Sequence, residues 1–424
     1  MRCQVKTVND LIARRCVVKR LYIGLDIGSA THEAVMLNEN HGVVKKLVVK
    51  QTILEISRFI EIIQKCKDEG NFEEVLIGLE GSNGYASPMD RMLVEVGFSL
   101  IAINSATLDK YRKLVGQPRK DDPYDAELVC KYLIDVYQLK GMKQNAQRIG
   151  NPDQASKGKL RIVTRHHRTT KRDLTRITNR LRKHILGYFP DFLTVFPNLH
   201  TKTARVLLKY YGTVGKVKKS RESTVAKAFI NKRRRVGPKS AAKLKALVKD
   251  IRYVDPLEDE MGKTTQSLVE QIDLLLSQIE ILQEQIAEMA NEMPEVQLIA
   301  KMIPGAGINN SSELIAEFGN ISRFLNRDKL SIYCGVGCLN HSSGKKVSAR
   351  KPTHFNHYAK GALCMMAQAA IVNDSESRKY YDKKRKEGKG HWHAIKCLAK
   401  YLLRHIFQLL SEMQASATQG KMAA

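Results

Sequence analysis

The stretch that decides the fold is Leu21-Tyr-Ile-Gly-Leu-Asp-Ile-Gly28, an apolar run that closes on an acid and a glycine. It predicts a buried β-strand, and Gly28-Ser-Ala-Thr31 predicts a turn into a second strand at 33–37. The same patterns predict further strands at 43–49, 74–80 and 99–103, and helices at 52–67 and 85–96. Three strands followed by strand–helix alternation indicate an α/β domain with a mixed central sheet.

From about residue 125 onward the pattern is helical, and its clearest feature is a heptad seam that stops at Pro294. The seam steps alternately by four and three residues through Leu268, Ile272, Leu275, Ile279, Leu282, Ile286, Met289 and Met293. A register this regular favours a coiled coil between two copies of the chain, and the alternative is a helix packed inside its own domain.

A chain of 424 residues is too long for one ordinary core. We expect a basic lead-in at 1–20, an α/β domain at 21–160, a helical or coiled-coil region at 161–293, a mostly α-helical C-terminal domain at 294–412 and a tail at 413–424. The helical region contains a basic insertion at about 190–250.

The chain is strongly basic, with 71 Lys and Arg against 43 Asp and Glu, a net charge of +28. Such an excess attracts a polyanion, and phosphate backbones release counterions when these side chains neutralise them. Nucleic acid is the expected partner; a basic soluble protein or one bound to a membrane surface is the alternative. We expect no membrane span, because no apolar run reaches the roughly 18 residues required.

The eight cysteines are scattered and form no Cys-x-x-Cys pair, which favours the reducing cytoplasm. Cys334, Cys338 and His341 hint at zinc, but a fourth ligand is missing and we do not expect the site.

Two segments could hold a phosphate backbone. The first spans 227–240 and contains Lys232, Arg233, Arg234, Arg235 and Lys239 before a new helix. The second is the glycine-rich turn Met302–Ile308 between two helical patterns. Both resemble helix-hairpin-helix elements, whose turns present backbone N–H groups to phosphate. The alternatives are a solvated charge run for the first and a plain structural turn for the second.

Four acids are placed where α/β sheets carry their sites. Asp26 and Glu80 end two predicted strands, and Asp122 is expected to cap a helix that starts at Pro123, with Asp125 three residues further on. Clustered carboxylates repel one another unless a cation balances them, and Mg²⁺, or Mn²⁺ in its place, takes oxygen ligands. Taken singly, Asp26 could simply turn a strand and Asp122 could be only a cap.

The segments IGLDIGS, LIGLEGSNGYA and KDDPYDAEL resemble the three blocks of the DEDD transposases of insertion sequences. That family has a RuvC-like (RNase H-like) N-terminal domain and includes the pilin-gene invertase and the bridge-RNA-guided recombinases. The resemblance implies that Asp26, Glu80, Asp122 and Asp125 are the four metal-binding acids. Asp121 stands where the family often has Thr and competes with Asp122, but the spacing to Asp125 favours Asp122.

The C-terminal segments IPGAG, RF, YCGV and HSSG resemble the second domain of this family, whose serine nucleophile corresponds to Ser343, with Ser342 as the alternative. Lys345, Lys346, Arg350 and Lys351 would then hold the phosphate. Two features near this serine depart from the family pattern. Cys338 stands near the position of the usual proline, and residues 353–360 replace the usual Lys-x-Gly block. Lys360 would then supply the positive charge of that block.

The resemblance implies a bacterial, nucleoid-associated DNA transposase or site-specific recombinase that works through a phosphoserine. It further implies a site shared between protomers of a dimer or tetramer, and it allows for a guide RNA. The alternatives are a RuvC-like nuclease that only hydrolyses DNA, or a nucleic-acid-binding protein without activity. The target sequence is not readable from the chain, nor is the choice among insertion, excision and inversion.

Overall fold

The computed structural model describes residues 18–80, 84–116, 121–137, 146–149, 152–231, 234–343 and 346–422. The chain divides into two compact units. The N-terminal unit runs to Lys157 and includes Gly319–Leu330, and the C-terminal unit comprises Gly158–Phe318 and Ser331–Ala424.

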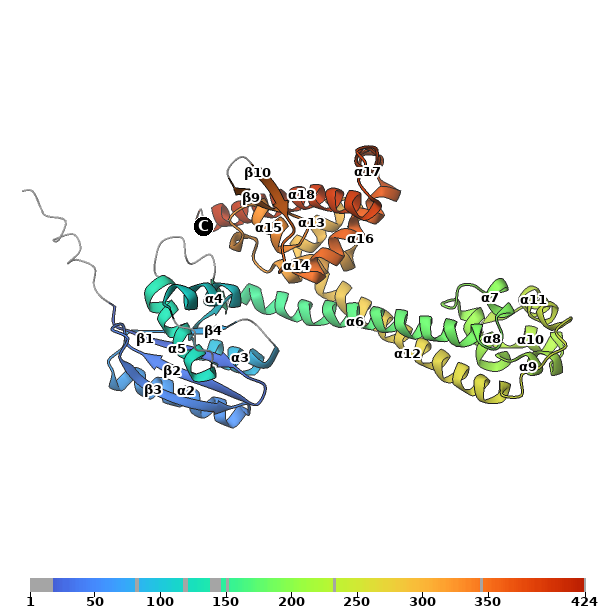
Figure 1. Cartoon of the computed structure of the whole chain (residues 1–424), viewed down its shortest axis with the longest axis horizontal. Helices are drawn as coiled ribbons and strands as arrows, with labels where there is room; N and C mark the ends of the chain where they lie inside the picture. The colour runs from blue at the N-terminus through green and yellow to red at the C-terminus, as the bar shows by residue number, and fades with distance from the viewer. Residues whose placement is uncertain are drawn as a thin grey trace, which may run out of the picture. The chain divides into compact units, whose positions relative to one another are not determined.

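A six-stranded sheet forms the centre of the N-terminal unit (Figure 1). Its strands are β1 (Arg20–Ile27), β2 (Thr31–Leu37), β3 (Val43–Lys50), β4 (Glu74–Glu80), β5 (Ser99–Ile103) and β6 (Ala146–Ile149), in the order β3-β2-β1-β4-β5-β6. The β1–β4 and β4–β5 pairs are parallel, and the other pairs are antiparallel. The predicted α/β fold with a mixed central sheet is confirmed. Strand β6 was not predicted, because it is short and lies in the part of the sequence that looked helical.

Helices cover both faces of this sheet. One face packs against α2 (Ile53–Glu69) and α3 (Ser87–Glu95). The other packs against α4 (Ser105–Leu114) and α5 (Asp122–Tyr132). Alternate residues of β1 divide between the two cores: Leu21, Ile23 and Leu25 join the first, and Tyr22 joins the second. The α5 face is therefore the face toward which even-numbered residues of β1 point.

A pair of glycines lets α5 approach the sheet closely. Gly24 and Gly78 are register partners on β1 and β4. A Cβ atom at Gly24 would lie 2.0 Å from the carbonyl oxygen of Ala126, and one at Gly78 would lie 2.7 Å from Cγ1 of Val129. A side chain at Gly24 would meet the backbone of α5, and one at Gly78 would displace the side chains of Val129 and Leu133, so the two glycines allow α5 to lie close to the sheet.

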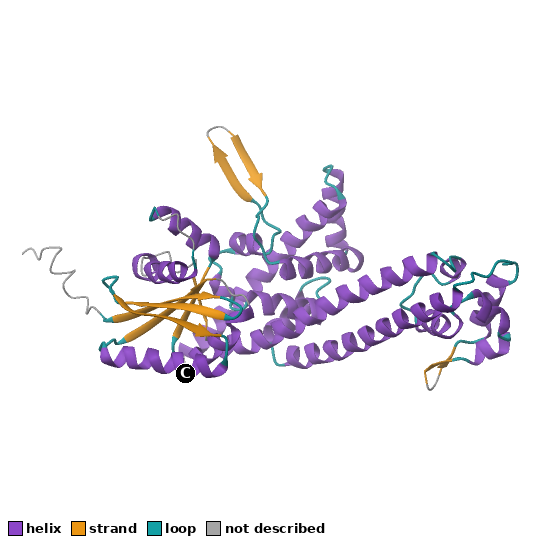
Figure 2. Cartoon of the chain, turned by 60° about the horizontal axis from the view of Figure 1, so that its bottom comes forward, coloured by secondary structure: helices purple, strands orange, loops and turns teal. Residues whose placement is uncertain are grey.

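In the C-terminal unit, α6 (Pro152–Leu186) and α12 (Glu258–Asn291) run side by side in opposite directions (Figures 1 and 2). Leu268, Ile272 and Ile279 of the heptad seam share a buried cluster with Leu174 and Leu181 of α6. The seam is thus covered largely within the chain itself, because α6 supplies an apolar face of its own. The favoured explanation of the heptads, a contact between two copies, is replaced by the alternative of a helix packed inside its own domain.

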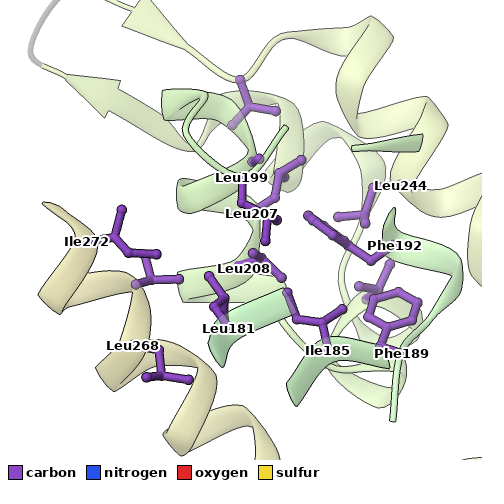
Figure 3. Packing of buried hydrophobic residues seen from close by; sticks show 14 of the residues in the cluster. Leu181, Ile185, Phe189, Phe192, Leu199, Leu207, Leu208, Leu244, Leu268 and Ile272 are labelled. Atoms are coloured by element: carbon purple, nitrogen blue, oxygen red, sulfur yellow. The ribbon is translucent and has the colours of Figure 1, made fainter. Parts of the chain in front are cut away.

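Between α6 and α12 the chain forms a small helical module, whose buried residues belong to the same cluster as those of α6 and α12 (Figure 3). Its elements are α7 (Asp191–Val195), α8 (Lys202–Tyr211), α9 (Val214–Lys219), α10 (Glu222–Lys227), β7 (Phe229–Asn231), β8 (Arg234–Arg235) and α11 (Pro238–Val248). Leu181, Phe192, Leu207, Leu244 and Leu268 point toward one another in its centre. The segment 227–240 is not a helix-hairpin-helix, because a two-stranded hairpin, β7–β8, separates its helices.

The remainder of the C-terminal unit is mostly helical, as predicted, and it also carries an antiparallel hairpin that was not predicted. The glycine-rich turn 302–308 packs against α16 (His357–Asn373), since a Cβ atom on Gly305 would lie 2.3 Å from the carbonyl oxygen of Met366. Packing therefore requires the glycine at this position, and phosphate binding by the turn stays a prediction. The elements are α13 (Pro294–Met302), α14 (Ile308–Phe318), α15 (Arg327–Tyr333), β9 (Leu339–Ser343), β10 (Lys346–Arg350), α16 (His357–Asn373), α17 (Ser375–Lys386) and α18 (His391–Met422).

Candidate active site

Strand register brings the first two predicted acids together. Leu25 of β1 and Leu79 of β4 are partners in a parallel pair, and Asp26 and Glu80 are the next residue of each strand. Asp26 lies two residues after Gly24, and Glu80 lies two residues after Gly78. Because side chains alternate along a strand, both acids lie on the same face of the sheet as these glycines, which is the face that α5 covers. Each is half-buried. The ends of β1 and β4 therefore present two neighbouring carboxylates on the face that α5 covers.

The first turn of α5 brings the other two acids. The helix begins at Asp122, and its N-cap is Asp121, whose Oδ1 accepts a hydrogen bond of 3.1 Å from the backbone N–H of Tyr124. The expectation that Asp122 caps a helix starting at Pro123 is wrong by one residue. Since Asp121 is occupied as the cap, the carboxylate of Asp122 does not serve that purpose. This arrangement agrees with the choice of Asp122 over Asp121 as a site residue.

The electrostatics of Asp26 show that the four acids are neighbours. Burial raises the pKa of Asp26 to about 6, and the negative charges of Asp122, Asp125 and Glu80 add to the rise. A half-buried carboxylate with three acidic neighbours holds its proton to a higher pH than usual. The site has an excess of negative charge that a cation would relieve.

Glu33 is a fifth acid that the sequence analysis missed. It is the direct antiparallel partner of Asp26 across the β1–β2 hairpin. Burial and the charge of Asp122 raise its pKa. The signal was present: the short turn from Gly28 to Thr31 sets the register that places Glu33 opposite Asp26. The acids on this face thus come from β1, β2, β4 and α5.

Asp125 is held by a buried ion pair. Nη2 of Arg112, on α4, donates to Oδ1 of Asp125 over 2.6 Å, and the two residues are 9% and 7% exposed. Nη1 of the same guanidinium lies 3.5 Å from Asp109. A buried carboxylate needs such a partner, so Arg112 allows Asp125 to be ionised at this position. No pattern in the sequence predicts that this arginine turns inward.

The donor chemistry of this cluster fits a hard divalent cation, because all of its acids supply oxygen. Among the described residues, however, no three His, Cys, Asp or Glu side chains stand close enough to form a ready-made metal shell. Asp125 is engaged by Arg112 in this structure. The acids are gathered at one end of the sheet without being closed into a coordination sphere.

The predicted nucleophile lies in a hairpin and not in an irregular loop. Ser343 is the last residue of β9 and pairs with Lys346, the first residue of β10. The alternative residue, Ser342, pairs with Val347 one step further from the turn. Figure 2 shows the two strands as a hairpin that projects from the helices of its unit. Gly344 and Lys345 are outside the described residues, and Arg350 at the end of β10 is exposed.

The predicted nucleic-acid-binding residues of the small module lie on β8 and at the start of α11. Arg234 and Arg235 form β8, and Arg235 is exposed. Lys239 is exposed in the first turn of α11. Lys232 and Arg233 are outside the described residues. The basic run therefore includes a short hairpin strand that leads directly into a lysine-rich helix.

The two cysteines that hinted at zinc differ in their exposure to solvent. Cys334 is buried, Cys338 is exposed, and neither is bonded to another cysteine. No described helix combines the length and the apolar character needed to cross a bilayer.

The chain thus combines acids gathered on a mixed sheet with a mostly helical unit that carries an antiparallel hairpin. Two family models match the chain: a DEDD transposase model over residues 23–190 and the transposase family IS116/IS110/IS902 over residues 298–382. Together they cover more than half of the chain. The protein belongs to this family of insertion-sequence transposases, enzymes that cut and rejoin DNA.

Relatives agree over nearly the full length. The 44.8 kDa protein of insertion element IS116 from Streptomyces clavuligerus is 23% identical, covering 93% of this chain and 95% of its own. The 42 kDa protein of IS900 from Mycobacterium paratuberculosis is 22% identical, with 92% and 96% covered. Among solved structures, RuvC of T. thermophilus in complex with a Holliday junction substrate is 13% identical, covers 31% of this chain and 99% of its own, and has a TM-score of 0.23.

Proposed function

We propose that this transposase cuts and rejoins DNA through a phosphoserine on Ser343, with Mg²⁺ or Mn²⁺ held by Asp26, Glu80, Asp122 and Asp125. The observation that carries the proposal is the raised pKa of Asp26, caused by burial and by three neighbouring acids. Such crowding of negative charge lowers the stability of the fold. It is typical of functional sites, where the charges serve binding or catalysis. A divalent cation is the partner that this donor set suits best.

The side chains of the cluster have separate tasks in this proposal. Asp26 and Glu80 are fixed by strand register, and the first turn of α5 is fixed by the glycine pair beneath it. Arg112 keeps Asp125 ionised and oriented. A bound divalent cation would supply a charge that stabilises the oxygens at a reacting phosphorus.

The serine step conserves the bond energy of the DNA backbone. Ser343 Oγ attacks the phosphorus, a P–Oγ bond forms, and the bond from phosphorus to the 3′ oxygen breaks. The serine proton leaves to a base, and the departing 3′ oxygen gains one to become a hydroxyl. The reverse reaction with the 3′ hydroxyl of another strand restores the phosphodiester and frees the serine. Strands are therefore exchanged without an external energy source.

Basic side chains outside the acidic cluster would hold the DNA. Arg235 and Lys239 are exposed on the small helical module, and Lys346 and Arg350 bound the β10 strand. Such residues bind phosphates without reading sequence. A guide RNA would supply the sequence reading that these contacts lack. Assembly into a dimer or tetramer is part of the same proposal, although the heptad seam no longer argues for it.

The test is a cleavage assay on DNA that carries the ends of the protein's own element, with Mg²⁺ and any RNA that copurifies with the protein. Wild type should give a DNA–protein adduct that survives denaturation. Ser343→Ala should lose the adduct, and Ser342→Ala, the matched control, should keep it. Asp26→Asn should abolish cleavage while DNA binding persists.

The alternatives predict different results. Unchanged cleavage by Ser343→Ala with no adduct in wild type would indicate a nuclease that only hydrolyses DNA. Binding without metal-dependent cleavage in every protein would indicate an inactive binder. Full activity of Asp26→Asn would remove Asp26 from the site. Mixing inactive Ser343→Ala with inactive Asp26→Asn tests whether subunits share a site, because recovered cleavage requires each protein to supply what the other lacks.

A further inference from the structure

A cavity of about 610 Å³ lies in the C-terminal unit, and its lining residues include neither the predicted acids nor Ser343. Its walls come from α17, from α18 and from the turn after α13. Its volume falls within the range of roughly 300–1,000 Å³ that is typical of small-ligand sites. Nothing in the proposed chemistry uses this cavity.

One wall of the cavity is aromatic. The rings of Tyr380 and Tyr401 are stacked, with centroids 5.1 Å apart and planes 22° apart. The His405 ring meets Tyr401 edge-on at 4.7 Å. Tyr401 is 41% exposed, so part of its ring is open to a ligand. Ile303 and Leu402 line the same cavity and are buried, which gives it an apolar base.

The rim of the cavity is basic. Lys379 and Lys383 line it and also line an adjoining cavity of about 600 Å³ that Lys386 borders. These lysines are four and three residues apart on α17, so they form a row along one face of the helix. Lys379 pairs with Glu376 over 2.8 Å. Within the described part of the chain, the structure records no ion pair for Lys383 or Lys386.

The acids near the cavity are already engaged. Asp374 caps α17 by accepting a hydrogen bond of 2.8 Å from the backbone N–H of Ser377. Glu376 is occupied by Lys379. The open wall therefore offers an aromatic ring beside a row of positive charge. Unpaired nucleotides suit this combination, because every base has a face that stacks and every phosphate attracts lysine.

We propose that this cavity binds one unpaired nucleotide of a single-stranded segment, with its base stacked on Tyr401 and the flanking phosphates along Lys383 and Lys386. The proposal rests on the proposed function only in that strand exchange exposes unpaired nucleotides. The shared chemistry covers single-stranded DNA and single-stranded RNA. A paired base is not available for stacking, so duplex should not use the cavity.

The experiment measures binding of the full chain in EDTA, where metal-dependent cleavage cannot occur. The probes are a ten-nucleotide thymidine oligonucleotide with one central 2-aminopurine, its RNA counterpart and a duplex of the same length. Stacking on Tyr401 should quench the 2-aminopurine fluorescence. Tyr401→Leu should restore that fluorescence and weaken binding about tenfold, the order expected for one lost base–aromatic stack. Tyr401→Phe should behave as wild type.

Two controls make the result decisive. Trp392→Ala removes another exposed aromatic from α18 that does not line the cavity, and it should leave quenching unchanged. Lys383→Gln should weaken binding and reduce its salt dependence while quenching at saturation persists. Equal binding by wild type and Tyr401→Leu, or equal loss with Trp392→Ala, would overturn the proposal.

The two single-stranded probes decide the source of the nucleotide: tighter binding of one assigns the cavity to DNA or to RNA. A Tyr401 effect on duplex of the same size would refute a site for unpaired nucleotides. Because EDTA removes cleavage from the measurement, failure here leaves the serine and acid chemistry standing. Failure of the cleavage assay equally leaves the cavity result intact.

Discussion

The six-stranded sheet and the two short hairpins place their functional residues in different ways. In the sheet, β1 is paired on both sides and covered by helices on both faces. Asp26 and Glu80 are therefore located by a core that fixes backbone and register together. The hairpins β7–β8 and β9–β10 are two-stranded sheets, in which each strand has one partner. They carry Arg235 and Ser343, and neither strand of either hairpin lies between two neighbouring strands in the described part of the chain.

Because of this difference, we expect the acidic site on the sheet to tolerate fewer substitutions than the two hairpins. An isolated two-stranded hairpin has marginal stability of its own, so its residues adjust easily to a bound strand. The acids depend on a helix lying directly on the backbone of two strands. Disturbing the packing under α5 should therefore affect the fold and the reaction together, whereas changes on a hairpin should affect binding or reaction alone.

The largest effect is expected from Gly24→Ala. The new Cβ atom would lie 2.0 Å from the carbonyl oxygen of Ala126 and 2.9 Å from the backbone nitrogen of Cys130. Because both are backbone atoms, α5 must move, and overpacking of this kind costs about 3 kcal/mol. A displacement of about 1 Å at the first turn of α5 should lower cleavage about 100-fold. Urea unfolding and the cleavage assay measure the two effects.

Gly158→Ala is the matched control for that substitution. Gly158 lies in α6, and a Cβ atom there would meet nothing within 4 Å. Alanine in a helix interior should raise the unfolding free energy by roughly 0.5–1 kcal/mol. If Gly24→Ala matched this control in stability and cleavage, the close seating of α5 would not determine the site.

The parts that the sequence predicted are those with a strong apolar pattern. Buried strands such as 21–27 and 74–80 contain runs that only a covered sheet explains, so the sheet and the acids at its strand ends could be placed in advance. The heptads of α12 were recognised as a seam, but a periodic apolar face does not say whether its partner is another chain or α6. That choice depends on a face of α6 far away in the sequence.

The parts that the sequence missed are polar segments and pairings across the fold. The segments at 229–235 and 339–350 contain mainly polar or basic residues, so neither hairpin has the alternating pattern that predicts strands. Arg112 looks like a surface residue in its helix, and only the folded chain turns it toward Asp125. Glu33 was within reach, since a short turn fixes its register opposite Asp26.

An intermediate effect is expected from the double variant Arg235→Gln with Lys239→Gln. Both side chains are exposed, so the unfolding free energy should change by less than about 0.5 kcal/mol. If each contacts one phosphate, the slope of log affinity against log salt should fall by about 2 in magnitude. A salt titration of duplex binding measures this change in slope.

The matched control is the pair Lys65→Gln with Lys67→Gln on α2, which should leave the slope unchanged. An unchanged slope in the first variant would exclude this hairpin from the DNA contact.

The smallest effect is expected in the metal-free protein, where Asp26→Asn should stabilise the fold. The native pKa of about 6 exceeds the ordinary value of 3.8, so the native state keeps a proton that the unfolded state loses. Stability therefore falls as pH rises from about 4 to 6, and the full cost remains above pH 6. Since Asp26 is only half-buried, solvent screening limits this cost to about 1 kcal/mol.

Asn carries no charge, so the variant should melt about 2–4 °C above wild type at pH 8 in EDTA and at the same temperature near pH 4. Asp68→Asn, which changes an exposed acid on α2, should shift neither value. A gain for Asp26→Asn that is equal at both pH values would trace the effect to packing. Saturating Mg²⁺ should reverse the order at pH 8, because a cation that binds the ionised cluster stabilises wild type alone. Charge repulsion of this kind persists only where a covered core holds the acids close together. The two-stranded hairpins have no core of that kind.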